Sequence, residues 1–179
     1  MPDRKLIYWD SCMFYEVLGN EDVAQSKRAA VEEILLENES GQNIIITSVI
    51  THIEVLPSKI DDKGGQDERD YISLFDADRY LEVEITTNIV MRAREIRNHY
   101  YRPADANGKG ARMMDAGDAL HLATATVLAI PDFHTRDNNK KKGNVPLLSL
   151  YTMYGENKIC GKYPLNISSP EAEQGTFPY

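Results

Sequence analysis

The chain has few cysteines and no long apolar run. Cys12 and Cys160 are the only cysteines, and no C-x-x-C spacing is present, so neither a disulfide framework nor a structural zinc site is predicted. The longest mainly apolar run, residues 119–130, falls well short of the roughly 20 residues that cross a bilayer. The N-terminal residues also lack the pattern of a secretory signal, so we expect a cytoplasmic protein.

Positive charge is in deficit as well. Twenty Lys and Arg residues face 28 Asp and Glu residues, which gives a net charge of −8. Binding to a phosphate backbone draws its affinity from Lys and Arg, so any contact with nucleic acid must be local. The "GKG" at residues 108–110 lacks the flanking residues of a phosphate-binding loop. The acidic excess is compatible with a metal site built from several carboxylates, although a solvated acidic surface is the commoner explanation of a low isoelectric point.

Short β-branched or aromatic runs alternate with segments of helical periodicity. This alternation predicts an α/β fold with a mostly parallel sheet covered by helices. We expect one domain over residues 1–150, followed by a partly flexible C-terminal extension over residues 151–179. The expected strands are residues 5–10, 43–48, 80–86, 130–137 and, as a fifth, 145–150, and the expected helices are residues 21–40, 48–60, 66–80, 87–101 and a segment from about 115 to 129.

Four acidic residues recur beside these elements. They are Asp10 after the first strand, Glu54 in the helix after the second, Asp118 in the apolar helix, and Asp137 after the fourth strand. The carboxyl ends of parallel strands meet along one crevice, so we expect these side chains to converge. Each acid alone has a structural alternative, because Asp10, Asp118 and Asp137 could cap helices and Glu54 could face solvent. Asp115 is expected to be the N-cap of the apolar helix.

Converging carboxylates predict a particular chemistry. Their oxygens are hard ligands that suit Mg²⁺ or Mn²⁺, and such ions can activate water against a phosphodiester bond. Clustered carboxylates also repel one another, and a bound cation keeps them ionised. The residues therefore predict metal-dependent hydrolysis of a phosphodiester.

The segments "IYWDSCMF", "SVITHIEVL", "DALHLATA" and "HTRD" resemble the acidic motifs of PIN-domain nucleases, most closely the VapC-like toxin ribonucleases of toxin–antitoxin pairs. The resemblance spans residues 5 to about 148. It implies a three-layer α/β/α fold, an endoribonuclease that cleaves RNA, a cognate antitoxin and a homodimer. Carried over by position, the metal-binding and catalytic residues are Asp10, Glu54, Asp118 and Asp137, with Ser11 and Thr135 as supporting hydroxyls.

Two features depart from this pattern. The loop at residues 102–112 and the tail after Leu150 are not explained by the motifs, which leaves open a PIN nuclease outside the toxin group or one with another nucleic-acid substrate. A second hypothesis is a catalytically silent PIN-like module that binds RNA or a protein.

Basic residues offer weaker candidates. Arg136 and the lysines at 140–142 could hold RNA phosphates, or they could form a solvated loop. Arg94, Arg97 and Tyr101 could bind single-stranded RNA, or they could lie on an exposed helix end. His121 is expected to be a packed core histidine, His52 and His134 stay undecided, and the aromatic residues Trp9, Phe14 and Phe133 are expected in the core.

Overall fold

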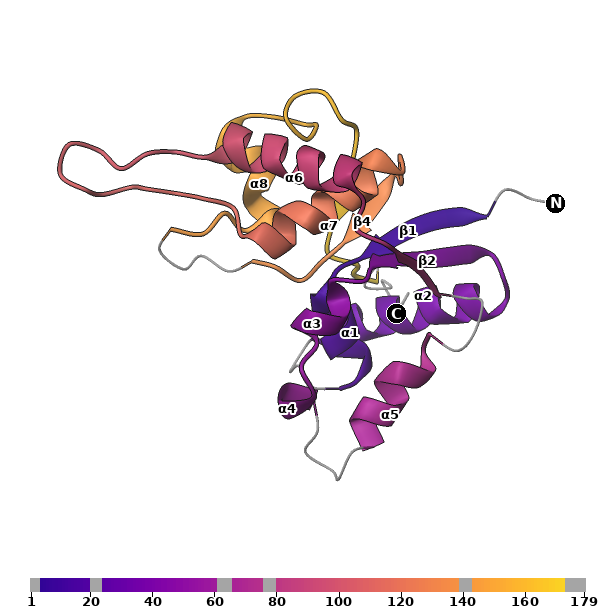
Figure 1. Cartoon of the computed structure of the whole chain (residues 1–179). Coiled ribbons are helices and arrows are strands. Elements are labelled where there is room, and N and C mark those ends of the chain that lie inside the picture. Colours follow the sequence, from indigo (N-terminus) through magenta and orange to yellow (C-terminus); the bar gives the residue numbers. More distant parts are fainter. Residues whose placement is uncertain (1–3, 20–23, 61–65, 76–79, 139–142, 173–179) are drawn as a thin grey trace, which may run out of the picture.

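Five parallel strands form the centre of the protein (Figure 1). The computed structural model describes residues 4–19, 24–60, 66–75, 80–138 and 143–172. The strand order is β3-β2-β1-β4-β5, and all four pairings are parallel. The strands are β1 Lys5–Trp9, β2 Asn43–Ser48, β3 Tyr80–Val83, β4 Asp132–His134 and β5 Asn166–Ser168. The α/β fold with a parallel central sheet is therefore confirmed.

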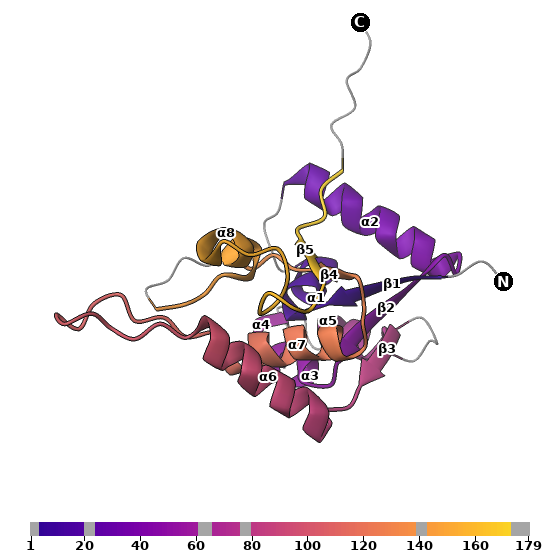
Figure 2. The same ribbon diagram turned by 90° about the horizontal axis from the view of Figure 1, so that it is seen from above.

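Helices cover both faces of this sheet (Figure 2). Successive side chains of a strand point to opposite faces, and β1 divides accordingly. Ile7 and Trp9 pack in one core with residues of α1, α2 and α5, whereas Tyr8 packs in the other with residues of α6, α7 and α8. The helices are α1 Ser11–Val17, α2 Gln25–Glu39, α3 Thr51–Glu54, α4 Pro57–Ile60, α5 Gln66–Ser73, α6 Thr87–Tyr100, α7 Ala116–Val127 and α8 Leu150–Tyr154. Two cores on one sheet give the three layers that the sequence predicted.

The helix expected over residues 48–60 is interrupted. It forms two four-residue helices, α3 and α4, with Val55 in an extended conformation between them. Pro57 disfavours helical geometry in the residue before it, which accounts for the break. The Tyr15 hydroxyl bridges the gap by donating to the Glu54 carbonyl and accepting from the Leu56 amide. Ile53, in α3, is 71% exposed.

The strand expected at residues 145–150 is also wrong. This segment forms a 3-10 helix, Leu147–Ser149, that leads into α8. The amides of Leu147 and Leu148 bind Asp137 instead of a neighbouring strand. The fifth strand is β5, which pairs with β4 and comes from the segment where sequence periodicity fades.

Residues 102–112 form a long projecting arm between α6 and α7 (Figure 1). Arg102 and Arg112 pair across its base in an isolated antiparallel bridge. Near the tip, Asp105 closes a turn, because its carboxylate accepts from the amides of Asn107 and Lys109. No helix in the described part of the chain is long and apolar enough to span a bilayer.

Candidate functional site

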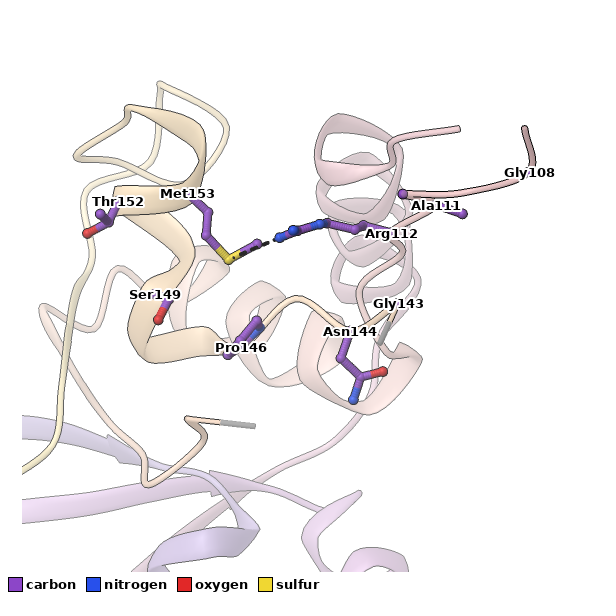
Figure 3. Close-up of a pocket in the computed structure, with 10 residues that line it drawn as sticks. Gly108, Ala111, Arg112, Gly143, Asn144, Pro146, Ser149, Thr152 and Met153 are labelled. Carbon is purple, nitrogen blue, oxygen red and sulfur yellow. Dashed lines mark hydrogen bonds between the residues drawn. The ribbon is translucent and has the colours of Figure 1, made fainter. Parts of the chain in front are cut away.

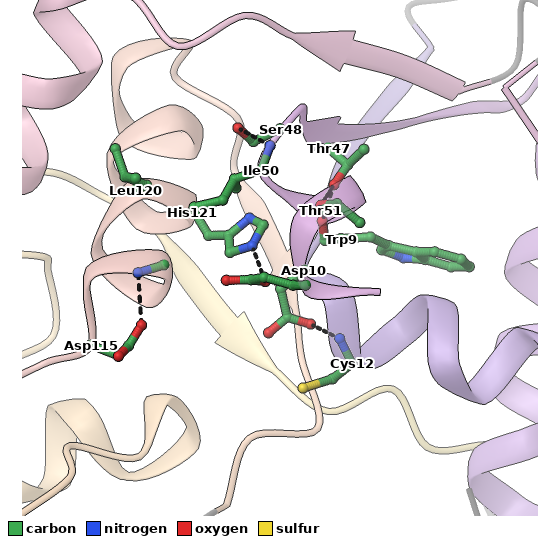
Figure 4. A network of polar contacts seen from close by, with 12 residues as sticks. Trp9, Asp10, Cys12, Thr47, Ser48, Ile50, Thr51, Asp115, Leu120 and His121 are labelled. Atoms are coloured by element: carbon green, nitrogen blue, oxygen red, sulfur yellow. Dashed lines mark hydrogen bonds and ion pairs between the residues drawn. The ribbon is translucent and has the colours of Figure 1, made fainter. Parts of the chain in front are cut away.

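The carboxyl end of β1 delivers the first acid. Asp10 follows Trp9 and caps α1, because its side chain accepts a hydrogen bond of 3.1 Å from the Cys12 amide (Figure 4). The Asp10 side chain is nearly buried, with the residue 3% exposed. Its pKa is raised from 3.8 to about 6, because burial and the charges of Glu54 and Asp137 outweigh the lowering by His121 and by a hydrogen bond from Thr135.

Glu54 is held at the end of α3 by a buried histidine. His121 Nε2 lies 2.9 Å from Glu54 Oε2, and His121 Nδ1 lies 2.8 Å from the Tyr8 hydroxyl. A carboxylate only accepts, so Nε2–H donates to Glu54, whereas the direction of the hydrogen bond between Nδ1 and the Tyr8 hydroxyl depends on the protonation of the ring. Burial acts to raise the pKa of Glu54, but hydrogen bonds from His121 and Ser11 bring it below its ordinary value. His121, 1% exposed, is therefore a buried connector and not a simple packing residue.

Asp118 lies in the first turn of α7, where Asp115 is the N-cap, as the sequence predicted. The Asp115 carboxylate accepts from the Gly117 amide at 2.8 Å. Burial and, after it, the charges of Asp137, Asp10, Asp115 and Glu54 together raise the pKa of Asp118 from 3.8 to about 7. Like charges that perturb one another in this way must lie close together. The structure thus brings the four acids predicted from sequence into one electrostatic field.

Asp137 follows β4 and is fixed by the backbone. The Leu147 amide donates to Asp137 Oδ2 at 2.9 Å, and the Asp137 amide donates to the Thr135 hydroxyl at 2.9 Å. Thr135 is fully buried and also hydrogen-bonds Asp10. Ser11 and Thr135, which the resemblance marked as supporting hydroxyls, each contact an acid of this set.

Gly117 makes room for Glu54. A Cβ atom added at Gly117 would lie 2.1 Å from Glu54 Oε1 and 3.2 Å from Asp115 Oδ1. A glycine in the first turn of a helix, between two aspartates, is a sequence signal that was overlooked, as was Tyr8. Only a glycine lets the Glu54 carboxylate approach the α7 backbone this closely.

The chemistry of the donor set fits a hard divalent cation. Carboxylate oxygens are the preferred ligands of Mg²⁺ and Mn²⁺. Within the described ranges, no Lys or Arg forms an ion pair with Asp10 or Asp118, so their repulsion is not relieved by a basic side chain. No three His, Cys, Asp or Glu side chains of the described residues are already arranged as a ligand set. Binding a cation would therefore require these carboxylates to move closer together. The hydrogen bond to His121 restrains Glu54 against such a movement.

The Arg136 side chain is almost buried and forms an ion pair. Its Nε and Nη2 lie 2.6 Å and 3.0 Å from the two carboxylate oxygens of Glu16, with the side chains 6% and 2% exposed. Arg136 Nη1 also donates to Ser169 and to the Pro170 carbonyl. Both candidate roles of this residue, phosphate contact and solvated loop, are wrong. It ties β4 to α1 and to the C-terminal segment.

The other basic, histidine and aromatic residues considered from sequence differ in burial and in their contacts. The lysines at 140–142 lie outside the described residues, Arg94 and Tyr101 are exposed, and Arg97 donates to the Met114 carbonyl. His134 is buried, accepts from Trp9 Nε1, and has its pKa lowered by burial to about 4. His52 contacts Tyr71 and Glu82 at the edge of the sheet. The expected core aromatics, Trp9, Phe14 and Phe133, are all fully buried.

Comparisons with known proteins agree with this architecture. The PIN domain model matches residues 7–143. The structure of VapBC2 from Rickettsia felis, bound to a DNA fragment from its promoter, is 14% identical with a TM-score of 0.55, over 91% of this chain and 97% of that chain. VapC20 of Mycobacterium tuberculosis, a Sarcin-Ricin loop cleaving toxin, is 10% identical with a TM-score of 0.50, over 71% and 86%. No curated protein matches the sequence. At these identities the solved structures show a shared fold.

Proposed function

Because this chain belongs to the PIN domain family, we propose that it is a metal-dependent endoribonuclease and the toxin of a toxin–antitoxin pair. One observation carries the proposal. Asp10, Glu54, Asp118 and Asp137 come from four separate elements, and their charges perturb the pKa values of Asp10 and Asp118 at the carboxyl edge of the sheet. In open parallel sheets this edge is where ligands bind.

These four acids would hold Mg²⁺ or Mn²⁺. When bound, such an ion supplies an activated water and positive charge against the phosphate oxygens. The chain itself orients the acids, because the Leu147 amide fixes Asp137 and His121 fixes Glu54. The dry surroundings of Asp10 strengthen its electrostatic interactions with whatever occupies the site.

The biological partners follow from the same proposal. The substrate is RNA. A cognate antitoxin protein restrains the activity, and the VapBC2 structure, which has a similar fold, supports such a partner. We further propose a homodimer that acts in the cytoplasm. A small DNA-binding protein encoded beside this chain would support the antitoxin.

The test is cleavage of total RNA by the purified protein with Mn²⁺, with Mg²⁺ and with EDTA. Asp10→Asn is the informative variant, because asparagine caps a helix as well as aspartate does and the α1 cap to Cys12 survives. Its activity is expected to fall by more than the roughly 10- to 100-fold that loss of an outer partner of a metal ligand costs.

Asp132→Asn is the matched control. Asp132 begins β4 at the opposite edge of the sheet, where it binds Asn166 and lies 3.5 Å from Lys5 Nζ. This variant should cleave like the wild type. If Asp10→Asn cleaves normally and calorimetry detects no Mn²⁺ binding to the wild type, the enzymatic proposal fails.

One observation favours the second candidate, a catalytically silent module. The described residues hold no ready ligand set, and Glu54 is already hydrogen-bonded to His121. In that case the wild type would bind RNA or a protein without cleaving RNA under any metal condition.

A further inference from the structure

A pocket of about 760 Å³ lies between residues 108–112, residues 143–149 and α8 (Figure 3). Its walls come from the base of the arm, from residues 143–149 and from α8. The residues that matter for its chemistry are Arg112, Asn144, Pro146, Ser149, Thr152 and Met153. Its volume lies within the range of pockets that hold small organic ligands.

The same two segments wall this pocket and hold the acids. Pro146 lines the pocket, and the next residue, Leu147, donates its amide to Asp137. On the other wall, Arg112 lies shortly before Asp115 and α7, which carries Asp118. The Met113 amide donates to the Gly143 carbonyl at 3.1 Å and ties the two walls together. The segments that line the pocket therefore lead directly to residues that bind or carry acids of the proposed cleavage site.

Arg112 gives the pocket a positive charge. It is exposed, and its Nη1 lies 3.7 Å from the Met153 sulfur, which is a weak acceptor (Figure 3). In the part of the chain that the structure describes, no Asp or Glu forms an ion pair with it. Arg102, which pairs with Arg112 in the isolated bridge, already has other contacts. It stacks on Tyr154 and donates to two carbonyls of the main chain.

We propose that this pocket binds one nucleotide of single-stranded RNA next to the phosphate that is cleaved. Arg112 holds the phosphate of that nucleotide, since a guanidinium matches phosphate geometry. Met153 offers apolar surface to the base, and Asn144, Ser149 and Thr152 offer hydrogen-bonding groups to its edges. A base enters such a pocket only when it is unstacked, which selects single strands over duplexes. This inference rests on the proposed function.

The experiment measures fluorescence anisotropy of a labelled single-stranded RNA 12-mer in EDTA, with Asp10→Asn as background so that the probe stays intact. Arg112→Gln is expected to weaken binding about tenfold, because it removes one charge-assisted contact. The slope of log affinity against log salt should fall by about 0.7, the value for one phosphate of a single strand. Arg28→Gln removes the same charge from the exposed face of α2 and should change neither quantity.

A second variant tests the cavity itself. Thr152 is exposed on α8, so Thr152→Trp fills the pocket without entering the core. It should weaken binding at least tenfold with an unchanged salt slope, whereas Asn157→Trp, at an exposed position that is not among the pocket-lining residues, should bind normally. Duplex RNA of the same sequence should be insensitive to both tryptophan variants.

The outcomes separate this inference from the proposed function. Wild-type protein that cleaves RNA, combined with unchanged RNA affinity in Arg112→Gln and Thr152→Trp, overturns the pocket and leaves the nuclease. Pocket-dependent binding by a wild-type protein that cleaves no RNA upholds the pocket and overturns the nuclease. Equal losses for single-stranded and duplex RNA also overturn the pocket.

Discussion

We predict that Asp118→Asn makes the metal-free protein more stable at pH 8. Asp118 has its pKa raised from 3.8 to about 7 by burial and by the neighbouring acids. A raised acid pKa means that the folded protein favours the protonated form. The contribution of protonated Asp118 to the stability of the folded protein is fully present below about pH 4 and is lost as the pH rises through about 7. Asparagine cannot ionise, so the variant escapes this loss.

The magnitude follows from the shift. A change of about 3 pKa units corresponds to about 4 kcal/mol at 1.36 kcal/mol per unit. Asparagine also gives up the attraction between the Asp118 carboxylate and the α7 dipole, which is worth up to about 1 kcal/mol. We therefore expect a net gain of about 3–4 kcal/mol in the free energy of unfolding at pH 8, and almost none at pH 4.

The assay is urea unfolding in EDTA at pH 4 and at pH 8, on either side of the isoelectric point near 5.0. Asp132→Asn, at the opposite edge of the sheet, should change stability by less than about 0.5 kcal/mol at both pH values. Mn²⁺ should then stabilise the wild type more than the variant. A wild type at least as stable as Asp118→Asn at pH 8 would refute the electrostatic account of the site.

Three further predictions concern the supports of the site. Gly117→Ala should leave the melting temperature within about 2 °C of the wild type but weaken Mn²⁺ binding in calorimetry, because the new Cβ displaces the end of the Glu54 side chain. Arg136→Met should cost about 3–5 kcal/mol in urea unfolding, since it leaves Glu16 buried and unpaired; a loss below 1 kcal/mol would contradict this. Tyr8→Phe should cost about 1 kcal/mol and reduce Mn²⁺ affinity up to about tenfold, because the imidazole of His121 loses its second hydrogen bond.

The sequence predicted most of the sheet because the central strands β1, β2 and β4 are mostly buried. Runs such as residues 43–48 are continuous and β-branched, and that pattern depends only on local composition. The three-residue edge strand at Asn166–Ser168 was missed because it is too short to carry a pattern. The apolar run at residues 145–150 predicts a strand, but residues 147–149 form a 3-10 helix because the Leu147 amide binds Asp137.

Some features of the candidate site could likewise be predicted from sequence, and others could not. The positions of Asp10 and Asp137 after buried strands follow from strand boundaries, which are local features. The burial of Arg136 against Glu16 could not be predicted, because these residues are 120 positions apart and meet only when α1 packs beside β4. The role of His121 was likewise hidden, since its partners Tyr8 and Glu54 lie on other elements.

The layered α/β architecture and the choice of candidate acids followed from sequence, because hydrophobic periodicity and residue chemistry are properties of short segments. Which groups touch became visible only in the folded chain: the histidine that holds Glu54, the glycine that admits it, and the arginine that borders a pocket. Such contacts depend on packing between distant segments, and no local pattern specifies their geometry.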